Sequence, residues 1–474
     1  MECLIKRTVD SLLSVVHHIR CSPIYATYLL VAGSVALCVA LCGCRTPTRS
    51  IDVAREAFFA GDLQASRATL GEVIESNRRW SDASQLDLAI VDLADGNPRA
   101  AEQRLRQMRE SFDALPAAAP LHEAASLVSD DTARPFRPAG YEEVMVRALL
   151  AVCSLAGDGA DAESYCLQAA MKQSELARQA GERGLENADE LYRPIALAPY
   201  MRGVLREASH RDYDDAAAAY QLVSAASPQF APIGEDIRRA SEGVHSAPGH
   251  GVLYVIACVG RGPRLVETVA PTTTASLQIA STILQSVQQD AEEDEGGFVL
   301  PNIASVKVPA VDVPQDDLTA LGVSVNGQLF GATQTLTDVA QLAREQVEAE
   351  MPWTIARAVA RRVTKEATVA GAGKGLGLQG NAASLFQFAA ASAWSGTEHA
   401  DTRCWGLLPR EIQVLRAELP AGQHQIGLTQ LNHLGHPMAL PQVVDAEIVD
   451  GRNRYVIVIA PGPHLFVVCG EDER

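Results

Sequence analysis

An internal repeat of 35 residues limits what the first half of this chain can fold into. Shifting the sequence by 35 positions places residues on others of the same kind: Ala54 on Ala89, Phe58 on Leu93, Gly61 on Gly96, Ala65 on Ala100 and Leu70 on Leu105. Repeats of about 34 residues are typical of paired helices that stack side by side. Glycine favours the backbone angles that end a helix. The repeat therefore predicts helical hairpins with turns at Gly61 and Gly96.

The helical pattern continues over residues 51–245 and becomes less regular along the chain. Later residues have the spacing of the large, small, aromatic and proline positions of a tetratricopeptide unit: Tyr200, Ala216, Tyr220 and Pro228. We predict a tetratricopeptide-like solenoid, interrupted by a proline-rich loop from Leu115 to Gly140. Such solenoids bind a protein or peptide on their concave side. The alternative is a helical domain that packs against its neighbour without a ligand.

Residues 246–474 form a second predicted domain that is rich in strands. It follows a turn-rich stretch from Ser246 to Gly251, and the apolar run Val252–Val259 suits a buried strand, with Arg264–Val269 as its hairpin partner. Asn326-Gly327 predicts a second hairpin. The further predicted strands are Ser305–Val308, Val323–Val325, Gln328–Phe330, Ile412–Ala417, Gln425–Leu428, Ala446–Val449, Tyr455–Ile459 and His464–Val468.

A helical insertion is predicted between these strands, at about residues 335–394. One helix would run from Leu336 to Glu350, and Pro352 would start the next, which carries an apolar stripe at Ile355, Val359 and Val363. The fold class predicted for the chain is therefore α+β, with an α-helical solenoid followed by a β-rich domain that contains a helical insertion.

The N-terminal residues predict export and lipid attachment. Lys6, Arg7 and Arg20 precede an uncharged run that ends Leu41-Cys42-Gly43-Cys44, which resembles a bacterial lipobox. Residues 1–43 would be a signal peptide, Cys44 would carry the acyl chains, and residues 44–50 would be a tether. Arg45 after the cysteine favours the outer membrane, with the protein facing the periplasm. The alternative is an uncleaved membrane anchor.

Charge and cysteine content exclude some classes of partner and cofactor. Lys and Arg total 40 against 58 Asp and Glu, and a net charge of −18 argues against nucleic-acid binding. The sequence has no CxxC and no Cys and His cluster with zinc spacing, so we expect no metal and no cofactor. Cys153 and Cys166 would fit a disulfide across a helical hairpin, although cysteine is also an ordinary small buried residue.

One specific motif stands in the second half. Glu398-His399-Ala400-Asp401-Thr402-Arg403-Cys404-Trp405-Gly406-Leu407-Leu408-Pro409 resembles a family of uncharacterised bacterial envelope lipoproteins, in which an acidic residue, Ala-Asp, Arg, Trp and Leu-Pro precede a strand. Ser129-Asp130-Asp131, Tyr141-Glu142 and the trio Arg357, Arg361 and Lys365 also resemble that family. The similarity extends from about Ile51 to Val468, and Cys404 departs from it. It implies a tetratricopeptide-like half and a strand-rich half, with no established activity.

Two groups of residues are candidates for contact with a partner or ligand. Asp401 and Arg403, beside an exposed Trp405, would suit a glycan or peptide; alternatively Asp401 caps a turn or pairs with Arg403 while Trp405 packs under the strand. Arg357, Arg361 and Lys365 recur every four residues. They would form a basic stripe for lipid phosphate, anionic glycan or an acidic partner, or a solvated helix face.

The sequence favours binding over catalysis. It contains no HExxH and no GxSxG, and no nucleophile stands out, so we predict no enzyme. The preferred function is a lipid-anchored periplasmic scaffold that recruits a protein partner in the cell envelope. The alternatives are a module that binds glycan or peptidoglycan, and a periplasmic hydrolase.

Overall fold

The computed structural model describes residues 47–115, 135–182, 188–289, 303–375 and 399–470. Residues from Ser50 onward form a single compact unit. The predicted helical and strand-rich domains are therefore parts of one body. The signal peptide, Cys44 and residues 45 and 46 of the predicted tether lie outside the described residues, whereas residues 47–50 of that tether belong to the first helix.

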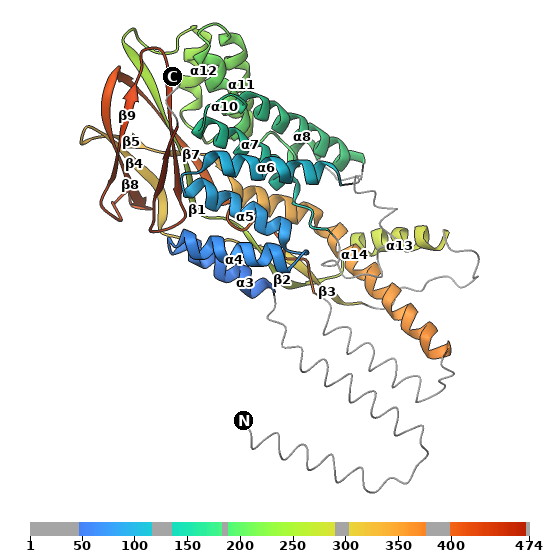
Figure 1. Ribbon diagram of the computed structural model, residues 1–474. Coiled ribbons are helices and arrows are strands. Elements are labelled where there is room, and N and C mark those ends of the chain that lie inside the picture. Colours follow the sequence, from blue (N-terminus) through green and yellow to red (C-terminus); the bar gives the residue numbers. More distant parts are fainter. Residues whose placement is uncertain (1–46, 116–134, 183–187, 290–302, 376–398, 471–474) are drawn as a thin grey trace, which may run out of the picture. The chain divides into compact units, whose positions relative to one another are not determined.

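The first half is helical, as predicted. Its helices are α3 (Pro47–Phe59), α4 (Leu63–Ser76), α5 (Ser81–Ala94), α6 (Pro98–Asp113), α7 (Gly140–Ala156), α8 (Ala162–Glu182), α9 (Ala188–Leu191), α10 (Leu197–Ala208), α11 (Tyr213–Ala226) and α12 (Ile233–Ser241). Successive helices pack as hairpins (Figure 1). Gly61 and Gly96 both have positive φ at the predicted turns, and Pro98 starts α6. The repeat predicted these features because turn chemistry is local.

The strands form three sheets. They are β1 (His250–Arg261), β2 (Arg264–Pro271), β3 (Ser305–Asp312), β4 (Leu318–Val325), β5 (Gln328–Ala332), β6 (Gln334–Asp338), β7 (Pro409–Pro420), β8 (Gly422–Asn432), β9 (Gln442–Ile448), β10 (Asn453–Ala460) and β11 (Phe466–Cys469). The central sheet has the order β11-β10-β1-β7-β6, the outer sheet has the order β5-β4-β8-β9, and β2 pairs with β3. The chain is thus α+β, as the sequence predicts.

The two faces of β1 explain how the layers are held together. Tyr254 and Ile256 belong to the core shared with the helices, whereas Val255 and Ala257 belong to a second core shared with the outer sheet. Side chains alternate between the faces of a strand. Because both faces are covered, β1 reads as a continuous apolar run. The helices, the central sheet and the outer sheet therefore form three successive layers.

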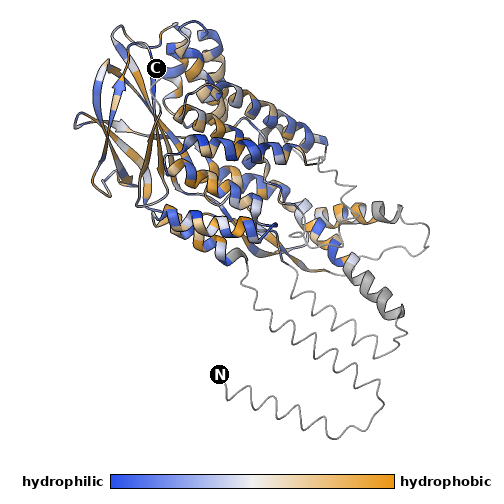
Figure 2. Cartoon of the chain, in the orientation of Figure 1, coloured by the Kyte–Doolittle hydropathy of each residue, from blue (hydrophilic) through white to orange (hydrophobic). Residues whose placement is uncertain are grey.

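The first helix of each hairpin packs on the central sheet. Phe58 of α3 stacks on Phe466 of β11, and Asn453 of β10 lies at the Val204 carbonyl of α10. Helices α5 and α7 contact β11 and β10, and every residue of α7 is buried. The helices mix hydrophilic and hydrophobic residues along their length (Figure 2). Of the two alternatives drawn from the repeat, the structure shows packing against the neighbouring half of the chain.

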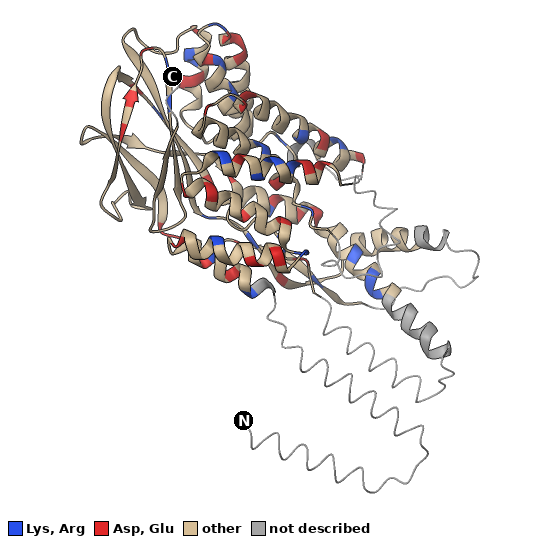
Figure 3. Cartoon of the chain, viewed as in Figure 1, with Lys and Arg blue, Asp and Glu red and all other residues tan. Residues whose placement is uncertain are grey.

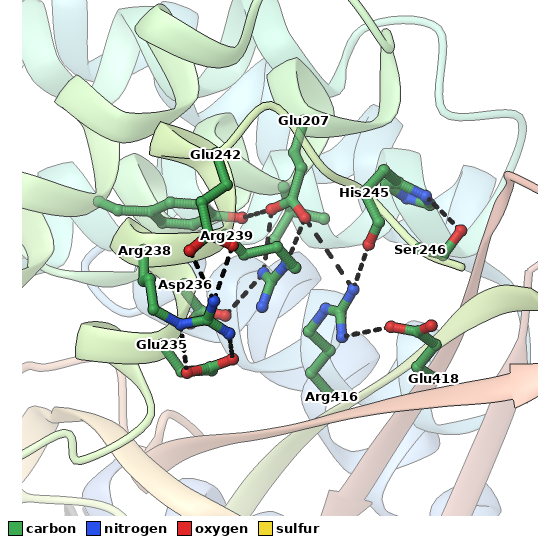
Figure 4. A network of polar contacts seen from close by, with 12 residues as sticks. Glu207, Glu235, Asp236, Arg238, Arg239, Glu242, His245, Ser246, Arg416 and Glu418 are labelled. Carbon is green, nitrogen blue, oxygen red and sulfur yellow. Dashed lines mark hydrogen bonds and ion pairs between the residues drawn. The ribbon is translucent and has the colours of Figure 1, made fainter. Parts of the chain in front are cut away.

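A buried polar network joins the last helices to the central sheet (Figure 4). Glu207 of α10 accepts hydrogen bonds from Arg239 of α12 and from the Tyr220 hydroxyl, the latter at 2.7 Å. Arg416 of β7 lies 3.9 Å from Glu207 and donates to the His245 carbonyl at 2.6 Å. Glu207 is inaccessible to solvent. Paired charges therefore link these helices to the sheet within the interior.

Two predictions about local structure are wrong. Arg264–Val269 lies in β2, which pairs with β3 rather than with β1, because both edges of β1 are already occupied by β7 and β10. The two predicted helices are one, α14 (Val339–Gly375), with Pro352 inside it. Ile355, Val359 and Val363 pack in a core with α13 (Thr274–Gln289) and β3, which stabilises the helix beyond the proline.

Within the part of the chain that the structure describes, no helix has the length and apolar character needed to cross a membrane.

Candidate functional site

The Ala400–Pro409 segment is folded by its own charged pair. The Arg403 guanidinium donates to both carboxylate oxygens of Asp401, with Nε–Oδ1 at 2.9 Å and Nη2–Oδ2 at 2.6 Å. The Arg403 amide also donates to Asp401 Oδ1 at 3.0 Å, which closes a turn. Nη1 of Arg403 reaches the Arg79 carbonyl at 3.0 Å, so the turn is tied to the helical half.

Of the two alternatives for this motif, the structure shows the second: Asp401 pairs with Arg403 and Trp405 is fully buried, not exposed to a ligand. Its amide donates to Glu142 Oε1 at 2.8 Å, and the Leu407 amide donates to Asp87 Oδ1 at 2.9 Å. Arg55 pairs with Asp87 at 2.7 Å and donates to the Cys404 carbonyl at 2.8 Å. Three helices thus bind the backbone of this segment directly.

Burial raises the pKa values of acidic groups where the Ala400–Pro409 segment meets the helices. It raises the pKa of Glu142 to about 7, although the amides of Trp405 and Ala139 favour the ionised form. Burial also raises the pKa of Asp87, against the opposing effect of Arg55. Cys404 is a buried thiol whose pKa is raised to about 11 by desolvation. Buried groups bonded to the main chain hold this segment in place, and Trp405 and Arg403 have no access to a glycan.

The predicted basic stripe on α14 is not an exposed stripe. Arg361 is buried and Arg357 is half-buried, because α14 packs against α13 and β3 on this part of its circumference. The Lys365 side chain lies outside the described residues. The three residues therefore do not form a common solvent-facing surface in the part that is described.

Cys153 and Cys166 are both present as free thiols, without the predicted disulfide. They lie on adjacent helices, and both belong to the core that the helices share with the central sheet. Desolvation raises the pKa of both thiols. The pKa of the Cys166 thiol is raised to about 12. The two cysteines are packing residues of the helical core.

One cavity of about 220 Å³ opens at the seam between the helical and strand-rich halves. Its lining combines the turn between α7 and α8 with β9, β10 and Gly470, and includes Asp158, Glu447, Arg452 and Tyr455. Among the described residues, no three His, Cys, Asp or Glu side chains gather closely enough to hold a metal ion.

The outer sheet presents an unusual surface that we call the uncharged face. No Asp, Glu, Lys or Arg occurs in residues 318–332 or 422–444, in a chain that is 21% charged. In Figure 3 this sheet lacks charged residues apart from acidic ones on β9, whereas the helices carry many of both signs. The cross-strand register places Leu329, Ser324, Gly427 and Val443 in one row across its outer side. Small residues thus lie between exposed apolar ones.

The loop between β8 and β9 belongs to the uncharged face and has a defined conformation. Asn432 Oδ1 accepts the amides of Leu434 and His436, each at 3.0 Å, and the Met438 amide donates to the Gln430 carbonyl at 2.9 Å. Its apolar side chains nevertheless face solvent: Leu434 is 64% exposed and Leu440 is 90% exposed. The loop therefore displays large apolar groups on an ordered backbone.

No protein-family model matches the chain, and no curated protein matches it. A solved structure of the MamA protein is similar over 42% of this chain and 82% of its own, with 16% sequence identity and a TM-score of 0.26. A similarity this weak carries no conclusion about fold or function. The site must be judged on its own geometry.

The uncharged face was not among the sites predicted from the sequence. The signal was present as two stretches without charged residues, the second of which places Leu434, Met438 and Leu440 in a turn-rich segment. Large apolar residues are unusual in such a segment, because turns favour Gly, Pro, Asn, Asp and Ser. Their exposure became evident only from the structure, because a pattern of residues does not show which side of a sheet is covered.

Proposed function

We propose that this protein is a lipid-anchored, non-catalytic adaptor of the bacterial envelope that binds a protein partner through the uncharged face. One observation carries the proposal: an ordered loop holds Leu434, Met438 and Leu440 in solvent beside a sheet surface without charges. Contiguous exposed apolar surface typically marks an interaction site. The lipobox that ends at Cys44 supports the envelope location.

The order of the loop favours binding. A loop whose backbone is already fixed loses little conformational entropy when a partner covers it. Apolar side chains that a partner removes from water stabilise a complex roughly in proportion to the area that is buried. Leu440 and Leu329, at 90% and 79% exposure, have nearly all of their surface available for this.

A protein suits this surface better than a lipid bilayer does. Anionic lipid surfaces attract Lys and Arg. The uncharged face contains neither, and the exposed Asp445 and Glu447 of β9 border it. These carboxylates oppose contact with anionic headgroups, so the expected partner is a protein.

The helical array is not the proposed binding surface. The helices α3, α5, α7 and α10 pack on the central sheet, so the side that faces the sheet is buried in a shared core. A partner would have to displace the chain's own core to reach it.

Photo-crosslinking in intact cells tests the proposal. A photo-crosslinking amino acid at position 440 is compared with one at Met171 of α8, which is 72% exposed. We expect position 440 to give discrete protein adducts that position 171 does not give, and expect them to weaken in the unanchored Cys44→Ala variant. Identical adduct patterns at both positions, or none at 440, would contradict the proposed function.

A further inference from the structure

We propose that the partner contributes an amphipathic helix whose apolar stripe is bordered by Lys or Arg, and that Asp445 and Glu447 recognise those cations. This inference rests on the proposed function and specifies the chemistry of the partner.

The register of β9 places two carboxylates on the outer side of the sheet. Ala446 and Ile448 are buried in the core between the sheets. Because side chains alternate along a strand, Val443, Asp445 and Glu447 all point the other way, and all three are exposed. The apolar surface therefore continues directly into an acidic margin.

Neither carboxylate forms an ion pair among the described residues, although Glu447 lines the seam cavity together with Arg452. Their cross-strand partners on β8 are uncharged: Asp445 lies opposite Gln425, and Glu447 lies opposite Gln423. The ion pairs of the described residues include neither carboxylate. Other acids of the chain are paired, as where Asp92 meets both Arg67 and Arg104. The two carboxylates are thus available to a cation from another molecule.

The charge pattern selects among possible occupants. A second copy of this chain would bring the same acidic margin and a net charge of −18. An anionic lipid surface would also be repelled. A protein surface with an apolar centre and a basic border complements both parts of the face, and such complementarity governs partner choice more than affinity.

The dimensions suit a helix. The row from Leu329 to Val443 crosses four strands, which spans about 14 Å at the usual strand spacing. A helix with its side chains is about 10–12 Å wide. Between the two apolar ends lie Ser324 and Gly427, and a Cβ on Gly427 would lie 2.3 Å from Ser324 Oγ. Because Ser324 and Gly427 have small side chains, a helix has room to lie between Leu329 and Val443.

The test measures binding of a designed peptide to the purified full-length protein. The probe is a fluorescent 18-residue helix of about equal Leu and Lys, with a Leu/Glu peptide of the same pattern as its counterpart. Asp445→Asn combined with Glu447→Gln is compared with Glu72→Gln combined with Glu75→Gln, which removes the same charge from exposed positions of α4. A photo-crosslinker at position 329 reports where the peptide lies.

We expect the Leu/Lys peptide to crosslink at position 329, and its affinity to fall by roughly 3- to 30-fold in the β9 variant, as for loss of two surface ion pairs. The α4 variant should bind as the parent does. Equal weakening in both variants, or an unchanged affinity in the β9 variant, would overturn the inference.

The result is separable from that for the proposed function. Charges on an edge strand also prevent edge-to-edge pairing. If that is their only role, the β9 variant will self-associate in sedimentation while peptide binding stays the same, and the inference fails. The in-cell adducts at position 440 would still stand in that case. Loss of those adducts in the parent chain would instead refute the proposed function.

Discussion

Several charged side chains are buried where the Ala400–Pro409 segment meets the helices. Asp87 is inaccessible to solvent and Arg55 nearly so, and both bind backbone groups of that segment. Removing one partner of a buried ion pair leaves the other charge without compensation. Individual residues at this contact between the segment and the helices should therefore contribute strongly to the stability of the fold.

Replacing Arg55 with Met tests this at a single residue. We expect Arg55→Met to lower the free energy of unfolding by about 3–5 kcal/mol, because Asp87 would lose its buried partner. Urea denaturation provides the measurement. Arg211→Met is the matched control, since its side chain is 83% exposed in its pair with Asp212 and should matter little. Similar losses in both variants would refute the role of burial.

Glu142 should make stability depend on pH. Burial raises its pKa from 4.5 to about 7, so between these values the folded chain binds more protons than the unfolded chain. The free energy of unfolding of the protein therefore falls as pH rises from 4.5 to about 7. Glu142→Gln removes the titration. Relative to the parent, the variant should gain up to about 3 kcal/mol as pH rises from below 4.5 to above 7.

Denaturant titrations at several pH values measure this difference, and Glu72→Gln on the exposed side of α4 is the control. A constant difference between Glu142→Gln and the parent across the window would show that Glu142 does not titrate there.

The contacts of these residues were beyond the reach of sequence reasoning. Trp405 bonds to Glu142 across 263 positions, and Leu407 bonds to Asp87 across 320 positions. The motif indicated that Asp401, Arg403 and Trp405 matter. It did not show whether these residues bind a ligand or pack against the helices, because the answer depends on which distant helices cover Trp405.

At the scale of elements, prediction succeeded where the determinants are local. Gly61 and Gly96 end helices at the predicted turns, and Asn326-Gly327 forms the predicted hairpin between β4 and β5, with both residues at positive φ. Val252–Val259 is the buried core of β1. Its partners were not predictable, since β7 and β10 pair with β1 across at least 148 positions and leave no edge for Arg264–Val269.

The loop between β8 and β9 provides an element-scale test of the proposed function. Asn432→Ala removes the acceptor that holds the amides of Leu434 and His436. We expect crosslinking from position 440 to fall several-fold while the global melting temperature changes little, because only the loop loses its order. Asn97→Ala, in the turn before α6, is the control. Unchanged crosslinking in Asn432→Ala would show that the ordered loop is not required.

At the scale of the whole molecule, the helices and sheets share one body. The central sheet contributes one face to the core with the helices and the other to the core with the outer sheet. The sequence predicted a helical half and a strand-rich half. It did not predict that they share a core, because each half has enough apolar residues for a core of its own. A shared sheet implies that the halves unfold together.

Substitutions on the two faces of β1 test this union. Ile256 faces the helices and Leu253 faces the outer sheet. Ile256→Ala and Leu253→Ala should each lower the free energy of unfolding by about 2–5 kcal/mol. Calorimetry should show one transition that both variants shift. Two transitions, each moved by only one substitution, would mean that the halves unfold separately.

The central claim is that a protein partner covers the uncharged face while the outer helices stay accessible. Hydrogen–deuterium exchange of the full-length protein, in isolated cell envelopes and after purification away from its partners, tests it most directly. We predict slower exchange in the envelope for residues 318–332 and 427–447, with α4, α6 and α8 unchanged. Slower exchange in those helices, with the outer sheet unaffected, would contradict the account.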